Sequence, residues 1–213
     1  MANSDVDLAS LLCSKICHDL LSPVGAINNG LELLEEESDP VMRDRCMDLV
    51  ADSARTSADK LKYFRLAFGA AGGFGEEVDP AEARHLIESL IGDSGKITLG
   101  WGLQNGALPK KAIKILLNLA LIAKESLVRG GTLDVGAEKG EIGIEVVVRA
   151  EGKKIALDAG IRKALDGSIN PAELSARTVA AWMTRELAQQ NAGELKISPP
   201  SETELLLGAI VTA

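Results

Sequence analysis

A long helical pattern fills the first seventy residues, and it limits the possible folds more than any other feature of the sequence. Apolar residues recur every three or four positions over about seven turns, the spacing of one helix face: Leu8, Leu12, Ile16, Leu20, Val24, Ile27, Leu31 and Leu34. Pro40 suits the first turn of a second helix that runs to about Phe68. One hairpin cannot bury both apolar faces, whereas two hairpins packed as a four-helix bundle can. We therefore predict a homodimer through residues 5–70.

The glycine-rich segment 69–75 interrupts the helical pattern and predicts a domain boundary. We expect a helical hairpin domain at 1–72 and an α/β domain at 76–213. The fold class is then α+β, a dimeric four-helix bundle followed by an α/β sandwich with helices on one face of a mixed sheet. Periodicity predicts helices at 80–91, 110–128 and 172–191, the last closed by a left-handed cap at Gly193. It predicts strands at 96–101, 131–137, 141–150, 194–197 and 204–211, with a turn at 138–140.

The composition excludes several classes of function. The net charge of −8 disfavours nucleic acids and anionic membranes, and an aromatic content of 3% is too low for a base-stacking surface. No apolar run approaches the roughly 18 residues of a membrane span, and the polar first residues do not resemble a signal peptide. Cys13, Cys17 and Cys46 fit buried helix positions better than a disulfide framework or a zinc site. We expect a protein of the reducing cytoplasm.

His18 lies on the first helix but away from its apolar face. It is two positions from both Ile16 and Leu20, and at about 100° per residue it points away from them. Its own face is small or polar, which leaves the imidazole open to another protein; that face carries Ser14, Lys15, Ser22, Gly25 and Asn29. We interpret the second histidine, His85, as a surface residue.

Pro23 stands five positions after His18, inside the same helix. A proline there lacks an amide donor and crowds the carbonyl of Asp19, which costs about 3 kcal/mol in an ordinary helix. It is either a harmless kink or a local distortion beside a reactive site.

The segment His18-Asp19-Leu20-Leu21-Ser22-Pro23 resembles the phospho-acceptor box of histidine kinases. Residues 12–31, together with Arg65-Leu66-Ala67-Phe68-Gly69, are more closely similar to the ChpT-like histidine phosphotransferases of alphaproteobacterial phosphorelays. The resemblance implies that His18 accepts a phosphoryl group from the receiver domain of a hybrid histidine kinase, CckA-like. It also implies transfer to the receivers of response regulators, CtrA- and CpdR-like, in cell-cycle control.

The residue types around His18 fit this chemistry. A neutral imidazole can attack an aspartyl phosphate, and a neighbouring carboxylate can fix its tautomer. We expect His18 and Asp19 to be catalytic, although Asp19 could instead be a solvated charge. Lys15 and Ser22, each one turn away, are candidates to support the phosphate, although a lysine there is commonly solvent-facing. The chain has no evident metal site, and the resemblance implies that the receiver partner brings Mg²⁺.

The α/β domain resembles the ATP-binding domain of histidine kinases in layout, but the nucleotide motifs are degraded. Asn118 aligns with one asparagine of the kinase Asn box, while the second is Ile122, which cannot ligate Mg²⁺. The adenine-binding aspartate is replaced by Ala150, and the phosphate loop falls at 178–181, where no glycine occurs. We expect a degenerate kinase domain that binds no ATP.

A receiver is expected to cover a groove between the two helices. If the chain turns near Ser38, His18 is level with about Ala58. Besides Ser14 and Ser22, the candidate contacts are Gly25, Ala26, Asn29, Asp52, Arg55, Thr56 and Asp59. Gly25 and Ala26 could instead pack against the chain's own second helix.

Three functions remain open at this stage. The first is a phosphoryl carrier, a phosphotransferase that is not an ATP-dependent kinase. The second is an ATP-dependent histidine autokinase, disfavoured by the lost nucleotide motifs. The third is a non-catalytic, kinase-like interaction module, disfavoured by the motif from His18 to Pro23.

Overall fold

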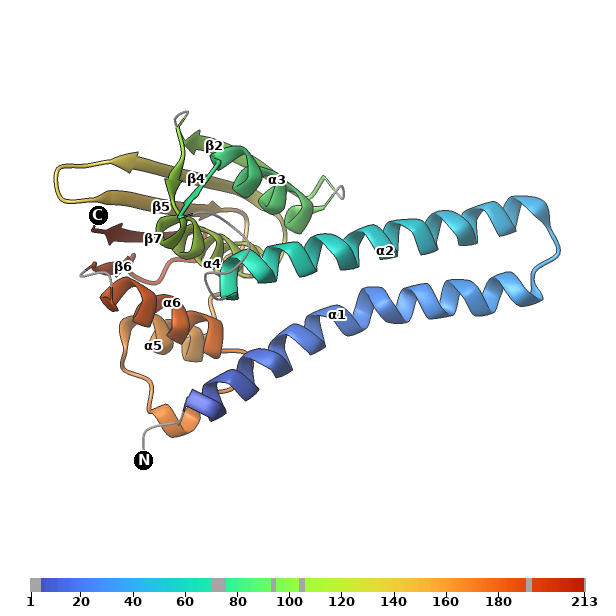
Figure 1. Ribbon diagram of the computed structural model, residues 1–213, viewed down its shortest axis with the longest axis horizontal. Coiled ribbons are helices and arrows are strands. Elements are labelled where there is room, and N and C mark those ends of the chain that lie inside the picture. The colour runs from blue at the N-terminus through green and yellow to red at the C-terminus, as the bar shows by residue number, and fades with distance from the viewer. Residues whose placement is uncertain (1–4, 70–75, 93–94, 104–105, 191–192, 213) are drawn as a thin grey trace.

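The computed structural model describes residues 5–69, 76–92, 95–103, 106–190 and 193–212, so most of the predicted domain boundary lies outside it. A long helical hairpin projects from an α/β body (Figure 1). Its helices are α1 (Asp5–Glu36) and α2 (Pro40–Phe68), which confirms the two predicted helices and the turn near Ser38. Asp39 begins α2 by accepting a hydrogen bond from the Met42 amide, and Arg43 donates to the Leu34 carbonyl across the turn.

The buried residues of α1 do not belong to the predicted apolar stripe. Pro23 and Gly30 are buried on α1, and Cys46 and Ser53 are buried on α2. A Cβ on Gly30 would lie 2.6 Å from Val50 Cγ2, so glycine is what allows the helices to approach. The single chain leaves part of the stripe uncovered, with Val24 and Leu31 43% and 48% exposed, as expected if one hairpin cannot bury both apolar faces.

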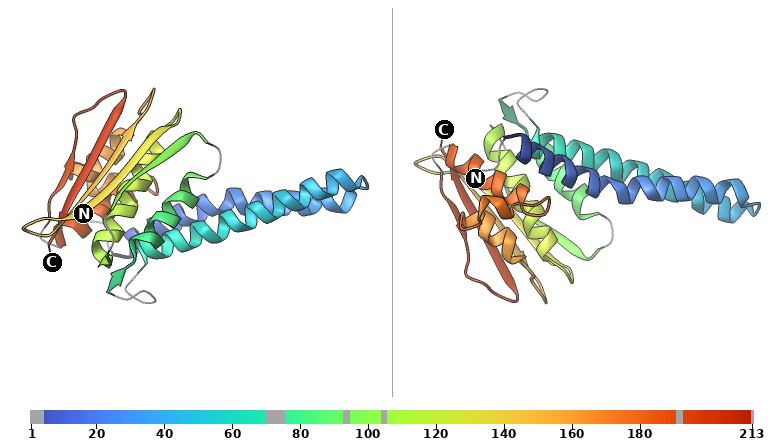
Figure 2. Two further views of the ribbon diagram at one scale, coloured as in Figure 1. Left: turned by 90° about the horizontal axis from the view of Figure 1, so that it is seen from above. Right: turned by 90° about the horizontal axis from the view of Figure 1, so that it is seen from below.

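The α/β body is built on a five-stranded mixed sheet of order β2-β4-β5-β7-β6. Its strands are β2 (Ile97–Leu103), β4 (Gly131–Lys139), β5 (Ile144–Glu151), β6 (Leu195–Ile197) and β7 (Glu204–Val211). Only the β2–β4 pair within this sheet is parallel. Its helices are α3 (Pro80–Ile91), α4 (Lys110–Ser126), α5 (Ala159–Asp166) and α6 (Val179–Gln190). The helices gather on one face of the sheet, as predicted (Figure 2).

Several predicted elements are corrected by the structure. The helix expected from residue 172 begins only at Val179, because Pro171–Glu173 form a short 3₁₀ turn. The turn expected at 138–140 lies at 140–143, where the Gly140 amide donates to the Gly143 carbonyl. Gly193 is absent from the positive-φ glycines, so the left-handed cap is wrong; its Cβ would lie 1.8 Å from the Ile210 carbonyl oxygen. Asn191 lies outside the described residues.

Three further elements escaped prediction. They are α5 and a two-stranded antiparallel ribbon of β1 (Glu77–Val78) and β3 (Leu108–Pro109). The signals for α5 are present in the sequence. Asp158 accepts hydrogen bonds from the first amides of the helix, and Gly167 ends it with a φ of 82°.

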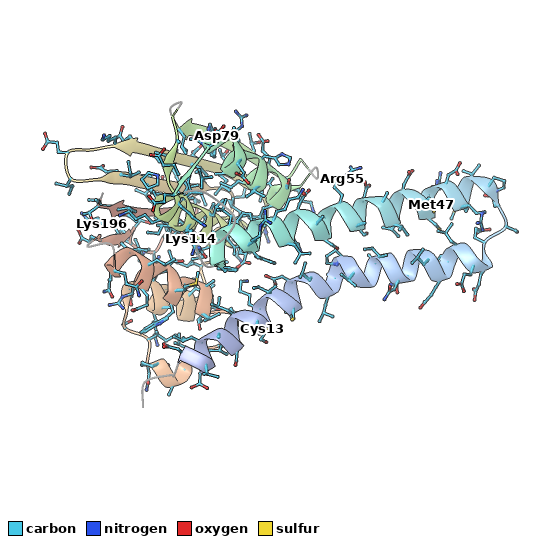
Figure 3. All side chains as sticks on the ribbon, in the orientation of Figure 1. Cys13, Met47, Arg55, Asp79, Lys114 and Lys196 are labelled. Atoms are coloured by element: carbon cyan, nitrogen blue, oxygen red, sulfur yellow. The ribbon has the colours of Figure 1, made fainter. Side chains whose placement is uncertain are left out.

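The end of α2 is part of the core of the α/β body. Tyr63, Phe64, Leu66 and Ala67 belong to the same buried cluster as α4 and the sheet. The Tyr63 hydroxyl donates to the Leu117 carbonyl of α4, and both groups are buried. Lys114 of α4 donates to the Gly69 carbonyl just beyond α2 (Figure 3). The hairpin is thus fixed to the body through α2.

Candidate functional site

The imidazole of His18 is presented to solvent from α1, with 84% of its side chain exposed. Its Nδ1 lies 3.2 Å from Asp19 Oδ1. A carboxylate only accepts, so Nδ1 carries the proton in this pair, and in the neutral form of the ring Nε2 then has the free lone pair. Within the described residues, Nε2 has no hydrogen-bond partner. The side chain is arranged as a nucleophile that a second protein can reach.

Asp19 is held by contacts on several of its oxygens. Its Oδ2 accepts a hydrogen bond from Lys15 Nζ at 3.1 Å, and Lys15 also lies 3.4 Å from Glu125 Oε1 of α4. The Lys15 side chain is only 9% exposed, so Lys15 does not share the open face with His18 as its helical spacing suggested. Its ammonium group instead turns toward Glu125 of α4. Lys15 touches the predicted site through Asp19 rather than beside the imidazole.

Pro23 leaves the carbonyl of Asp19 without its intrahelical donor, because the proline has no amide hydrogen. Lys60 of α2 donates to this carbonyl, with Nζ 2.8 Å from the oxygen. This contact also measures the hairpin register: residue 19 is level with residue 60, within a turn of the predicted level of Ala58. Sequence reasoning missed Lys60, although Pro23 and the register together pointed to its neighbourhood.

The remaining candidates on α1 lie along the side of His18. Ser14, Ser22 and Asn29 are exposed, and Gly25 and Ala26 are half-buried. A Cβ on Gly25 would meet nothing within 4 Å, so Gly25 does not pack against α2. The glycine that does is Gly30.

The candidates on α2 are mostly exposed. Asp52 and Arg55 form a solvent-exposed ion pair of 3.6 Å, a type of contact that contributes little to stability. Thr56 is exposed. Asp59 is largely covered and lies 3.1 Å from Lys62. Arg55 points away from α1, so it lies at the margin of the predicted groove (Figure 3).

The residues at the positions of the kinase nucleotide motifs are buried. Asn118 is fully buried, and its Nδ2 donates to the carbonyls of Ala67 and Lys114. Ile122 and Ala150 are buried as well. Thr178 forms a local turn with Ser175 through its hydroxyl. Asn118 therefore joins α4 to the end of α2 instead of facing an open site.

The cysteines depart from expectation. Cys46 is buried as predicted, but Cys13 and Cys17 are exposed in the single chain. In the part of the chain that the structure describes, no three His, Cys, Asp or Glu side chains group as metal ligands would. No helix among the same residues is long and apolar enough to cross a membrane.

Comparisons with known proteins agree on the class of protein. The family described as histidine phosphotransferase C-terminal domain matches residues 80–203. The protein phosphotransferase ChpT of Brucella abortus (strain 2308) is 35% identical over 199 residues, 93% of each chain. A solved bacterial phosphotransferase is 32% identical, with a TM-score of 0.83 over 98% of each chain.

The fold and these relatives define a protein phosphotransferase. The chain belongs to the family of ChpT-like histidine phosphotransferases.

Proposed function

We propose that this protein is a phosphorelay intermediate that carries its phosphoryl group on His18. The single observation that carries the proposal is the imidazole that is 84% exposed and held at Nδ1 by Asp19. The donor would be the phosphorylated aspartate of a hybrid kinase receiver. The acceptors would be the receiver aspartates of response regulators.

The chemistry follows from the tautomer. Nε2 attacks the phosphorus of the receiver's aspartyl phosphate, so a P–N bond forms and the P–O bond to the receiver carboxylate breaks. The imidazole becomes cationic while Nδ1 keeps its proton, and the Asp19 carboxylate stabilises that charge. Transfer to an acceptor receiver reverses these steps. We expect the Mg²⁺ of the reaction on the receiver, and we expect Ser22, which is exposed one turn after His18, to donate a hydrogen bond to the phosphate.

The exposure of the residues around His18 supports a receiver on this side of the hairpin. Most residues that flank His18 along α1 are small or polar, and a Cβ on Gly25 would meet no other atom within 4 Å. The receiver would contact Ser14, Gly25, Ala26 and Asn29 of α1 and Asp52, Arg55, Thr56 and Asp59 of α2. The resemblance to ChpT-like proteins leads us to propose a CckA-like donor, CtrA- and CpdR-like acceptors, and a role in cell-cycle control in the cytoplasm.

The opposite side of the hairpin supports a homodimer. On α1, one set of residues recurs every seven positions: Cys17, Val24 and Leu31. Val24 and Leu31 come directly after the buried Pro23 and Gly30. A matching set on α2 consists of Met47, Ala54 and Leu61, and its first two members come directly after the buried Cys46 and Ser53. In two antiparallel helices, the residue that follows each buried contact position points toward the same side of the pair. The two sets therefore lie on one face of the hairpin. All six are exposed in the single chain. A second hairpin packed there would complete a four-helix bundle.

Replacement of the nucleophile tests the proposal. His18→Ala is expected to abolish acid-labile label transferred from a ³²P-phosphorylated receiver, because no other side chain would supply the P–N bond. His85→Ala, which removes the other histidine, exposed on α3, is the matched control and is expected to keep transfer. ATP alone is expected to label neither protein. Undiminished transfer by His18→Ala would falsify the proposal, and labelling from ATP would favour an autokinase.

A further inference from the structure

Beside the proposed phosphoryl acceptor, a lysine from α2 takes the place of a missing backbone hydrogen bond in α1. The Asp19 carbonyl would ordinarily accept from the amide of residue 23, and Pro23 has none. A partly buried carbonyl without a donor costs roughly as much as a lost hydrogen bond. Lys60 Nζ satisfies it at 2.8 Å.

The position of this bond matters more than its energy. Asp19 is fixed at three atoms: Oδ1 by His18, Oδ2 by Lys15 and the carbonyl oxygen by Lys60. The first two contacts set the carboxylate, and the third fixes the backbone of the residue directly after His18. Pro23 removes that fixation from within α1, and Lys60 restores it from α2.

The charges around Lys60 are consistent with a fixed role. Burial lowers the pKa of Lys60, the Asp19 carboxylate opposes this, and Lys124 and Lys15 add to it. Lys15 and Lys60 thus both contact Asp19, Lys124 lies close enough to Lys60 to affect its charge, and Glu125 contacts Lys15. The cluster sits where α1, α2 and α4 meet, so the geometry of the acceptor depends on how the hairpin is seated on the body.

We propose that Lys60 is a positioning residue for the His18–Asp19 pair, acting through the Asp19 carbonyl that Pro23 leaves free. The inference rests on the proposed function for its kinetic consequence. Its structural part, the coupling of Lys60 to Pro23, can be tested independently of any phosphoryl transfer.

A double-mutant cycle between Lys60 and Pro23 tests the mechanism. In the wild-type background, Lys60→Met is expected to slow transfer from a phosphorylated receiver about tenfold, since small misplacements of reacting groups carry penalties of that order or larger. In the Pro23→Ala background the restored amide serves the carbonyl, so Lys60→Met is expected to cost less than about threefold. Lys60→Arg, which keeps a cationic donor, is expected to recover most of the rate. Lys163→Met, an exposed lysine on α5, is the control and is expected to leave the rate unchanged.

The ¹⁵N chemical shifts of the His18 ring give a second readout that needs no partner. Lys60→Met is expected to move the ring away from the single Nδ1-protonated tautomer, and Lys60→Arg and Lys163→Met are expected to leave it there. Wild-type ring shifts in Lys60→Met, or the same fold loss in both backgrounds of the cycle, would overturn the inference. Absence of transfer by the wild type with an intact ring-shift effect would instead remove the proposed function and keep the positioning role.

Discussion

At the scale of single residues, the proposed chemistry depends on the different surroundings of the two His18 ring nitrogens. Asp19 contacts Nδ1, which leaves Nε2 as the proposed nucleophile. The same carboxylate is the group that would stabilise the imidazolium after attack. Lys15 holds its second oxygen, so the carboxylate cannot rotate freely away from the ring.

Asp19→Asn is expected to slow phosphoryl transfer about a hundredfold, within the range for loss of a positioned acid–base partner. The amide cannot stabilise the imidazolium by charge, and Lys15 loses an ionic partner. Single-turnover transfer from a phosphorylated receiver measures the effect. Asp44→Asn, an exposed carboxylate near the hairpin tip, is the matched control. A wild-type rate in Asp19→Asn would show that Asp19 is only a surface charge.

The sequence was sufficient for the exposure of His18 and for its neighbour Asp19, because helical spacing and adjacency are local properties. It was misleading for Lys15, whose burial depends on α4, a contact between residues 110 positions apart. Gly30 rather than Gly25 proved to be the close-contact glycine, because the phase of one helix against another is set by packing. Lys60 lay between these cases: Pro23 predicted a free carbonyl, and only the hairpin register could say which residue meets it.

At the scale of elements, the end of α2 connects the hairpin to the body. Tyr63 and Asn118 both bind backbone carbonyls across the α2–α4 contact. Periodicity predicted α3 with its observed bounds and α4 closely, since their apolar faces are regular. It failed at 159–179, where short capped helices and a 3₁₀ turn carry too few turns for a period to emerge.

Tyr63→Phe is expected to lower the free energy of unfolding by about 1 kcal/mol near neutral pH, through loss of the buried bond to Leu117. Burial, with a smaller contribution from Glu125, raises the pKa of Tyr63 well above its usual 10.0. The unfolded chain therefore loses the tyrosine proton first, and the wild type loses stability as pH rises past that value.

Urea unfolding at about pH 8 and about pH 11 measures the difference between the two proteins. The phenylalanine variant has no phenol, and Tyr63 is the chain's single tyrosine, so the stability gap is expected to close at high pH. A gap that stays constant across this range would mean that the hydroxyl is not held protonated in the folded state.

At the scale of the whole molecule, the proposed receiver contact and the proposed dimer contact lie on different sides of the hairpin. His18 and Val24 are six residues apart, which at about 100° per residue places them about 120° apart around α1. The residues of α1 next to His18 are mostly small or polar, with the exposed Leu21 as the exception, whereas Val24 belongs to a line of exposed residues that continues on α2 with Met47 and Leu61. Two hairpins joined through the apolar side would leave both imidazoles outward, so two receivers could bind one dimer.

Val24→Asp tests this arrangement, because it would place an unpaired carboxylate in the centre of the proposed bundle. The wild type is expected to elute near 45 kDa by light scattering, twice the 22.4 kDa of one chain, and the variant is expected to shift toward monomer at low micromolar concentration. Leu33→Asp is the matched control, because Leu33 is an exposed leucine that does not belong to the six residues of the proposed dimer face. It is expected to stay dimeric. A wild type that remains a folded monomer in dilute solution would rule out the bundle, and a Val24→Asp dimer as tight as the wild type would place the interface elsewhere.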